Sequence, residues 1–234
     1  MRPRPLPLWR HEIRRAGWTA LLTPPLVVGT VVVVAALNVG EAGDLTTARA
    51  LFAALEMAAP LAAGIGAASL IGRDPVTELL ATMPTGYRSI LLRRLGVTVG
   101  WTALVAVLLA GSLLATGWWA RWPYNHGAVI GQLTWIAPTL GLAALGFLAG
   151  AVLRGPAAAG GLVGAFWIFQ QIFAGPAQEQ RWSRLLYLFV TTRGAVPADW
   201  TANRLTLIGT AGVLGVLAWL LLGRTERLLR AVAE

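Results

Sequence analysis

The chain has 234 residues, of which 56% are hydrophobic and only 12% are charged. A soluble domain usually carries about a quarter charged residues, so this composition is typical of a protein whose solvent is lipid. The chain has no cysteine, which excludes disulfides, thiolate catalysis and cysteine-based zinc sites. Its two histidines, His11 and His126, form no paired metal-binding motif, so we predict no metal site.

The formal net charge is +9, and all 19 basic residues are arginine. A strong positive charge can indicate nucleic-acid binding. Here most arginines lie beside hydrophobic runs, so we expect them to contact lipid headgroups. Membrane lipid is therefore a predicted partner, and nucleic acid is not.

The N-terminal residues 1–16 predict an amphipathic helix that lies in the membrane interface, because apolar side chains alternate there with arginine and histidine. Thr23, Pro24 and Pro25 then interrupt the first long apolar run. Two interpretations remain open. Either the first span kinks at the prolines, or Thr23 caps a shorter span that begins with proline.

A helix needs roughly 20 apolar residues to cross a bilayer. We therefore expect an all-α polytopic membrane protein with a single transmembrane domain over residues 1–234. The six predicted spans are Gly17–Leu37, Ala48–Ile71, Leu91–Trp118, Leu133–Leu153, Pro156–Ala174 and Ala202–Leu222. Residues 223–234 follow as a cytoplasmic tail.

The arginine distribution predicts that both termini are cytoplasmic, since cytoplasmic loops carry an excess of basic residues. With the N-terminus inside, the inner set has 13 members: Arg2, Arg4, Arg10, Arg14, Arg15, Arg73, Arg88, Arg93, Arg94, Arg154, Arg224, Arg227 and Arg230. The outer set has 6 members: Arg49, Arg121, Arg181, Arg184, Arg193 and Arg204.

Residues 73–94 predict a short amphipathic helix on the cytoplasmic side, between the second and third spans. Asp74 is a good N-cap, and a turn begins at Pro84. Thr77 and Glu78 point away from the apolar stripe of this helix. The helix is either an ordinary interfacial loop or a docking element for a cytoplasmic partner.

Polar residues inside predicted spans are candidates for a substrate pathway. Glu56 lies within the second span, where a carboxylate needs a cavity, a partner or a proton. Gln170 and Gln171 lie in the fifth span beside Phe166 and Trp167. These glutamines either line a substrate path or form hydrogen bonds between helices.

Glycine pairs with Gly-x-x-x-Gly spacing occur in the spans, at 96 and 100, 146 and 150, and 160 and 164. This spacing lets helix backbones approach closely in lipid. The pairs indicate either packing within the bundle or a face for dimerisation.

Taken together, the N-terminal interfacial helix, the six spans, the stretch LLATMPTGYRSILLRRL and the C-terminal LGVLAWLLLGRTERLL resemble the type-2 permease family of ATP-binding-cassette transporters. The resemblance implies that the loop between spans two and three docks on a cytoplasmic ATPase subunit. The residues that it places at or near this contact are Asp74, Thr77, Glu78, Pro84, Tyr87 and Arg88. It also implies that the residues around 185–190, too few to span, form a re-entrant helix on the outer side. An outer interfacial helix is the alternative.

A phosphate-binding loop needs a lysine to reach the phosphates, and this chain has none. We therefore expect no catalytic residue and no cofactor in this chain, and ATP and magnesium on a partner ATPase. The predicted function is the permease subunit of an ATP-driven exporter in the bacterial plasma membrane. Six spans are too few for a full transporter of this family, so a second permease subunit, identical or related, is implied.

Two other functions remain open from the sequence. One is an intramembrane enzyme that acts on lipids. The other is a membrane assembly factor or sensor partner that transports nothing.

Overall fold

The computed structural model describes residues 8–71, 87–194 and 197–233, and its regular secondary structure there is entirely helical, which confirms the all-α prediction. The elements are α1 (Leu8–Leu37), α2 (Val39–Ala53), η1 (Ala54–Ala58), α3 (Ala59–Ala68), α5 (Tyr87–Ala115), α6 (Trp118–Arg121), η2 (Ile130–Gln132), α7 (Leu133–Leu153), α8 (Pro156–Ile172), α9 (Ala174–Glu179), α10 (Arg181–Leu186), α11 (Val190–Arg193), η3 (Pro197–Asp199) and α12 (Trp200–Ala233). The predicted cytoplasmic helix, with Asp74, Thr77, Glu78 and Pro84, lies outside the described residues.

Four helical stretches in the described part of the chain are long and apolar enough to cross a membrane: Gly43–Ala68, Arg88–Ala115, Ile130–Leu153 and Pro197–Gly223. A shorter apolar helix covers Leu21–Leu37. The fifth predicted span corresponds to α8, whose 17 residues extend about 25 Å. These long apolar helices suggest a membrane location.

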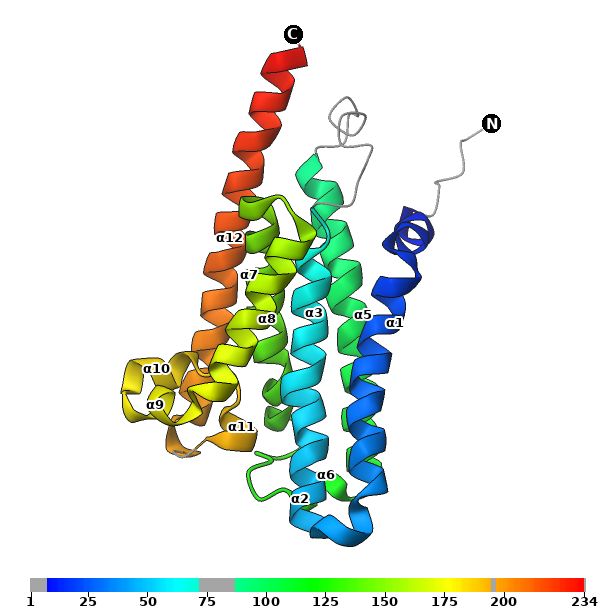
Figure 1. Ribbon diagram of the computed structural model, residues 1–234, viewed down its shortest axis with the longest axis vertical. Helices are drawn as coiled ribbons and strands as arrows, with labels where there is room; N and C mark the ends of the chain where they lie inside the picture. Colours follow the sequence, from blue (N-terminus) through cyan, green and yellow to red (C-terminus); the bar gives the residue numbers. More distant parts are fainter. Residues whose placement is uncertain (1–7, 72–86, 195–196, 234) are drawn as a thin grey trace.

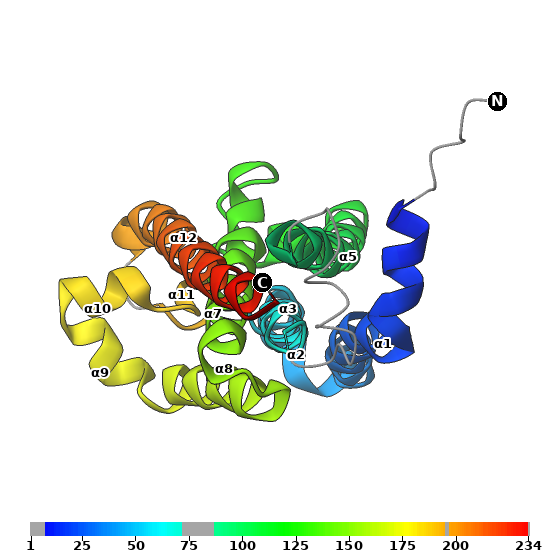
Figure 2. The same ribbon diagram turned by 90° about the horizontal axis from the view of Figure 1, so that it is seen from above.

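The helices α1, α3, α5, α7, α8 and α12 run roughly along the long axis of the molecule (Figure 1). Seen from above, α3 lies among α5, α7 and α8, while α12 lies against α7 (Figure 2). The short helices α9, α10 and α11 lie beside the bundle, nearer to its middle than α2 and α6, which form the end opposite the chain termini (Figure 1).

The α1 helix is continuous from Leu8 to Leu37 and contains both Pro24 and Pro25. Thr23 is therefore not the start of a shorter span, and that alternative is wrong. The N-terminal interfacial segment and the first span also form one helix. Its first turns run at a steep angle to the rest (Figures 1 and 2).

The contact between α3 and α7 depends on glycine. A Cβ at Gly146 would overlap the carbonyl oxygen of Gly64, and a Cβ at Gly150 would lie 3.1 Å from the carbonyl oxygen of Ala68. This glycine pair therefore packs the bundle internally. The pairs at 96 and 100 and at 160 and 164 have no neighbouring atom within 4 Å of such a Cβ, so they do not contribute to packing between the described helices.

The outer surface of the bundle carries large exposed apolar side chains. Leu108 is 65% exposed, Leu26 62%, and Val213 61%. By contrast, the interior of α3 is built from small residues such as Ala59, Ala63 and Ala67, which are fully buried. Small residues at the contacts between helices and large apolar side chains on the outer surface are the arrangement expected of helices packed in lipid.

Candidate functional site

Glu56 lies in η1, a π-helical turn inside the second predicted span. Four residues later comes Pro60, which has no N–H to donate to the Glu56 carbonyl, and its ring crowds that carbonyl. The wider π turn accommodates this interruption, and such turns often occur at functional positions. The proline thus explains why the helix widens where it carries its only acidic side chain between Ala48 and Ala68.

The Glu56 carboxylate is fully buried and is held by residues distant in sequence. Its Oε1 accepts from the backbone N–H of Thr191 at 2.7 Å. Its Oε2 accepts from the backbone N–H of Thr192 at 2.8 Å and from the Thr192 hydroxyl at 2.6 Å. The carboxylate therefore caps the first turn of α11, where unpaired N–H groups favour negative charge.

Arg204, in α12, completes the site as an ion pair with Glu56, and both side chains are 0% exposed. Its Nη1 donates to the carbonyl of Leu188 at 2.9 Å, and its Nη2 donates to the Thr191 hydroxyl at 2.7 Å as well as to Glu56. The neighbouring Asn203 donates through Nδ2 to the carbonyls of residues 184, 185 and 187, at 2.7, 3.1 and 2.8 Å. Two adjacent residues of α12 thus fix the chain that precedes it.

An aromatic and hydroxyl cluster extends this site toward the α6–η2 loop. The Trp200 indole donates to the Thr191 hydroxyl at 2.9 Å, and that hydroxyl lies 3.3 Å from the hydroxyl of Thr134. The His126 ring stacks on Trp200 with ring centroids 3.8 Å apart. Burial, and secondly the positive charge of Arg204, lower the pKa of His126 below its ordinary value.

The ion pair connects the second predicted span with the last one and with the segment between α8 and α12. Breaking such a buried pair costs about 3–5 kcal/mol, because it leaves one charge without a partner. We call Glu56, Arg204, Thr191 and Thr192 the buried clamp. Glu56 does not line the cavity described next, so any role in a substrate pathway stays a prediction.

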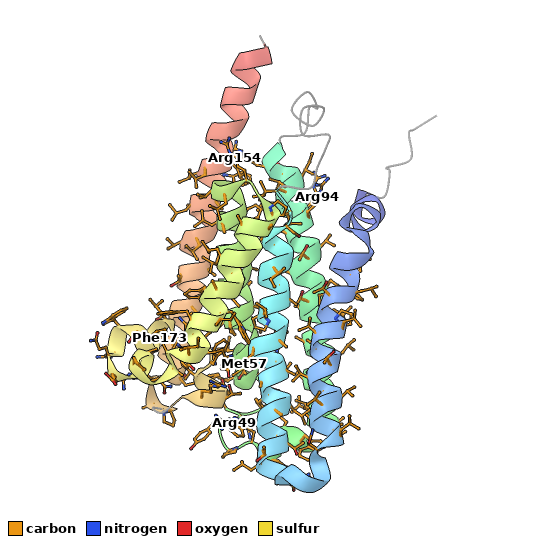
Figure 3. All side chains as sticks on the ribbon, viewed as in Figure 1. Arg49, Met57, Arg94, Arg154 and Phe173 are labelled. Carbon is orange, nitrogen blue, oxygen red and sulfur yellow. The ribbon has the colours of Figure 1, made fainter. Side chains whose placement is uncertain are left out.

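A cavity of about 580 Å³ lies between α7, α8, α12 and the α9–α10 segment. Its lining contains no charged side chain and is formed by Gly141, Leu142, Leu145, Phe166, Phe169, Gln170, Phe173, Pro176, Ala177, Gln180, Trp182, Ser183, Leu186, Leu188, Leu207, Thr210 and Leu214. Phe173 lies at the edge of the bundle beside α9 and α10 (Figure 3). This volume lies within the range of roughly 300–1,000 Å³ that small-molecule sites occupy.

The four candidate pathway residues of α8 divide into two groups. Phe166 and Gln170 line the cavity. Trp167 and Gln171 instead contact Met57: the indole donates to its carbonyl at 3.2 Å, and the Gln171 amide lies 3.1 Å from its sulfur. Trp167 and Gln171 therefore join α8 to the second predicted span. For Gln171 this agrees with the alternative in which the glutamines form hydrogen bonds between helices.

Of the residues expected at the ATPase contact, Arg88 is the one whose side chain the structure describes. Its guanidinium lies 4.6 Å from the centre of the Trp219 ring, and a Cβ at Gly223 would come within 2.8 Å of Nη1. Arg88 therefore packs the start of α5 against α12. Tyr87 is the first residue of α5.

Sequence reasoning did not identify Arg204, Thr191, Thr192 and Asn203 as site residues. Arg204 was counted among the outer arginines, but it is buried within the last apolar helix. One signal was available: an acidic residue inside a span needs a partner, and Arg204 lies inside the stretch Ala202–Leu222 that was itself predicted to span. Within the described ranges, no group of three or more His, Asp or Glu side chains could hold a metal ion.

No protein-family model, curated protein or solved structure matches this chain.

Proposed function

We propose that the chain is the membrane-spanning permease subunit of an ATP-driven exporter whose ATPase is a separate polypeptide. In this proposal the chain crosses the bacterial plasma membrane six times with both termini in the cytoplasm. It pairs with a second permease subunit, identical or related, to form the substrate pathway. The family resemblance of the sequence motivates the proposal, and three observations support it.

The first observation is the gathering of arginine at one end of the bundle, and it carries the proposal. Arg94 and Arg154 lie at this end, whereas Arg49 lies toward the other (Figure 3). The first residues of α1, the start of α5 and the end of α12 share the arginine-rich end (Figure 1). An excess of arginine marks the cytoplasmic side, and the end of α3 and the start of α5, between which the expected docking segment with Asp74, Thr77, Glu78 and Pro84 stands in the sequence, lie toward this end (Figure 1).

The second observation is a direct contact by which a push on this segment would reach the last helix. Arg88 lies one residue after the start of α5 and stacks over Trp219 of α12. A force applied by an ATPase to residues 72–86 would therefore act on α5 and α12 together. From α12 it would pass to Arg204 and, through the buried clamp, to the second predicted span.

The third observation comes from composition. Without a lysine, the chain lacks the residue with which a phosphate-binding loop reaches the phosphates, so the driving ATPase has to be a partner. Counting α1 and α8 as crossings, in addition to the four long apolar stretches, completes six spans. Shorter helices cross where the bilayer thins locally or where they oligomerise.

The test is co-purification with an ATPase. The chain is co-expressed in turn with each ATP-binding-cassette ATPase of the source genome, extracted in detergent and examined for a complex by size-exclusion chromatography. The key variant combines Asp74→Ala and Glu78→Ala. Asp44→Ala is the matched control, because Asp44 is a 68% exposed acid that pairs with Arg121 away from the proposed contact.

We expect one ATPase to co-elute with the wild type and with Asp44→Ala but not with the double variant. Thermal unfolding of the free variants shows whether each remains folded. If no ATPase binds the wild type, the exporter assignment fails. If the double variant binds as well as the wild type, the docking segment is elsewhere.

A further inference from the structure

The cavity between α7, α8, α9, α10 and α12 is lined by residues of this chain alone, and its lining indicates which class of ligand it can bind. Several of its lining residues are apolar and almost completely buried: Leu142 is 0% exposed, Leu188 2% and Leu207 4%. The side chains at its rim are large and open, with Trp182 66% exposed and Phe169 52%. The cavity is therefore a deep apolar recess with an aromatic mouth.

The recess is elongated along the bundle. On α12 it extends from Leu207 to Leu214, a rise of about 10 Å. Its polar lining residues are uncharged and come from several elements: Gln170 on α8, Thr210 on α12, Gln180 between α9 and α10, and Ser183 in α10. A mostly apolar lining with a few uncharged polar groups suits an apolar chain that carries one uncharged polar group.

One buried polar group supplies a second and independent observation. Gln170 lines the cavity and is only 8% exposed. Its Oε1 accepts from the backbone N–H of Leu188 at 3.3 Å, which fixes the amide so that Nε2 is directed away from that contact. Among the described residues, Nε2 has no hydrogen-bond partner, and it is not fully enclosed by protein atoms, so it is free to donate to a ligand in the cavity.

We propose that this cavity binds one hydrocarbon chain of a membrane phospholipid, with an ester carbonyl of that lipid accepting a hydrogen bond from Gln170 Nε2. The lining carries no charge, so it favours an uncharged acceptor such as an ester over a carboxylate or phosphate. Phe169 at the cavity is exposed, as are other apolar side chains of α8 and α12 such as Ile168 and Leu205. A lipid chain fills the recess without crossing an aqueous phase.

This inference rests on the membrane setting of the proposed function, and it does not depend on an ATPase partner. The purified protein is reconstituted into phosphatidylcholine vesicles that contain a small fraction of phosphatidylcholine with a diazirine on one acyl chain. After illumination, labelled residues are mapped by mass spectrometry. Leu142 and Leu207 are the informative positions, because bulk lipid around the bundle cannot reach them.

The test uses a variant that fills the recess. Gly141 lines the cavity, and a Cβ there meets no atom within 4 Å, so Gly141→Phe places a ring in the cavity without a backbone clash. Gly212→Phe is the matched control, because Gly212 has the same free space but lies outside the lining. Thermal unfolding checks each variant, and Leu214→Phe replaces Gly141→Phe if the latter does not fold.

We expect wild-type labelling at Leu142 and Leu207 that Gly141→Phe abolishes and Gly212→Phe leaves intact. Labelling confined to outward-facing residues such as Val213 and Val216, or unchanged in Gly141→Phe, overturns the proposal. A free long-chain alcohol with the same diazirine tests whether the cavity binds a free apolar chain and not the chain of a phospholipid. If the alcohol labels Leu142 and the phospholipid does not, the phospholipid assignment is wrong.

The hydrogen bond of Gln170 is tested separately by comparing the ester phospholipid with its diether counterpart, which lacks the carbonyl. The wild type should prefer the ester about two- to twelvefold, the range that one net hydrogen bond supplies. Gln170→Leu should still be labelled at Leu142 but should lose this preference. Equal labelling of ester and ether lipid in the wild type contradicts the role given to Gln170. A failure in either lipid test leaves the co-purification result unaffected, so the two proposals can fail independently.

Discussion

The buried clamp predicts a specific energetic coupling between two residues that are 148 positions apart. Arg204→Met removes the cation and leaves the Glu56 carboxylate buried beside uncharged groups. Breaking a buried pair in this way costs about 3–5 kcal/mol. For a chain of 150–250 residues, each kcal/mol lowers the melting temperature by about 2–4 °C, so we expect a decrease of about 6–20 °C.

Glu56→Met should be at least as destabilising as Arg204→Met. It leaves the guanidinium without a counter-charge and also orphans the N–H groups of Thr191 and Thr192, each at a cost of about 1–3 kcal/mol. The double variant carries neither charge, so only the cost of the two unpaired N–H groups remains. We therefore expect it to be more stable than the sum of the single effects predicts, by at least about 3 kcal/mol, the lower cost of one unpaired buried charge.

The assay is thermal unfolding of the purified protein in detergent, followed by the loss of monodisperse protein on size-exclusion chromatography. Arg121→Met is the control, since its ion pair with Asp44 is exposed and should contribute about 1 kcal/mol or less. The exchanged variant, Glu56→Arg with Arg204→Glu, should not recover stability, because an arginine at position 56 cannot accept the two backbone N–H groups. Additive single effects, or full recovery by the exchange, would refute the geometry of the clamp.

Three further changes probe other parts of the fold. Gly146→Leu should strongly destabilise the protein because its side chain would overlap the Gly64 carbonyl, whereas Gly160→Leu should have little effect in the same unfolding assay. Asn203→Leu should lower the melting temperature and increase proteolysis between α10 and α12, since the carbonyls of Leu185 and Tyr187 lose the Asn203 donor while that of Arg184 keeps only the Tyr187 N–H; unchanged proteolysis would contradict this. The folded-state pKa of His126 lies below its unfolded value, so the unfolded state binds the proton more readily, and stability should fall as pH drops below about 6.5. His126→Asn, which tolerates the positive φ at this position, should show a weaker fall in melting temperature from about pH 8 to about pH 5.5, and an equal fall would assign the effect to other groups.

The helices that lie deep in apolar sequence could be predicted closely. The predicted span 133–153 coincides with α7, and α8 begins at Pro156 as predicted, because Gly155 and Pro156 end one helix and start the next. These boundaries follow from local chemistry. The predicted tail carried no secondary-structure prediction, and α12 continues as a helix through it to Ala233.

The site residues were harder to predict because they depend on contacts between distant parts of the chain. Glu56 stood out as a carboxylate within a span, but its partners come from α11 and α12. Arg204 lies two residues inside the predicted last span, where an arginine is ordinarily interfacial, so its burial follows only from packing. The cavity likewise exists because α9 and α10 lead from the end of α8 across to α12, and this packing on α12 depends on contacts between distant residues that the local sequence does not show.

The separation of the clamp residues along the chain has a consequence for how the protein is made. Ribosomes add about 5–20 residues per second, so Arg204 is synthesised about 7–30 seconds after Glu56. During that interval the nascent chain holds the Glu56 carboxylate within an apolar helix without Arg204, its ion-pair partner. When α12 arrives, its own arginine adds an insertion cost, which is smaller than the about 2.5–3.5 kcal/mol of a helix centre because Arg204 lies near the start of α12. Each half of the pair therefore makes the other half's helix acceptable to the bilayer, and a chain truncated before α12 retains an unpaired acid that membrane quality control can detect.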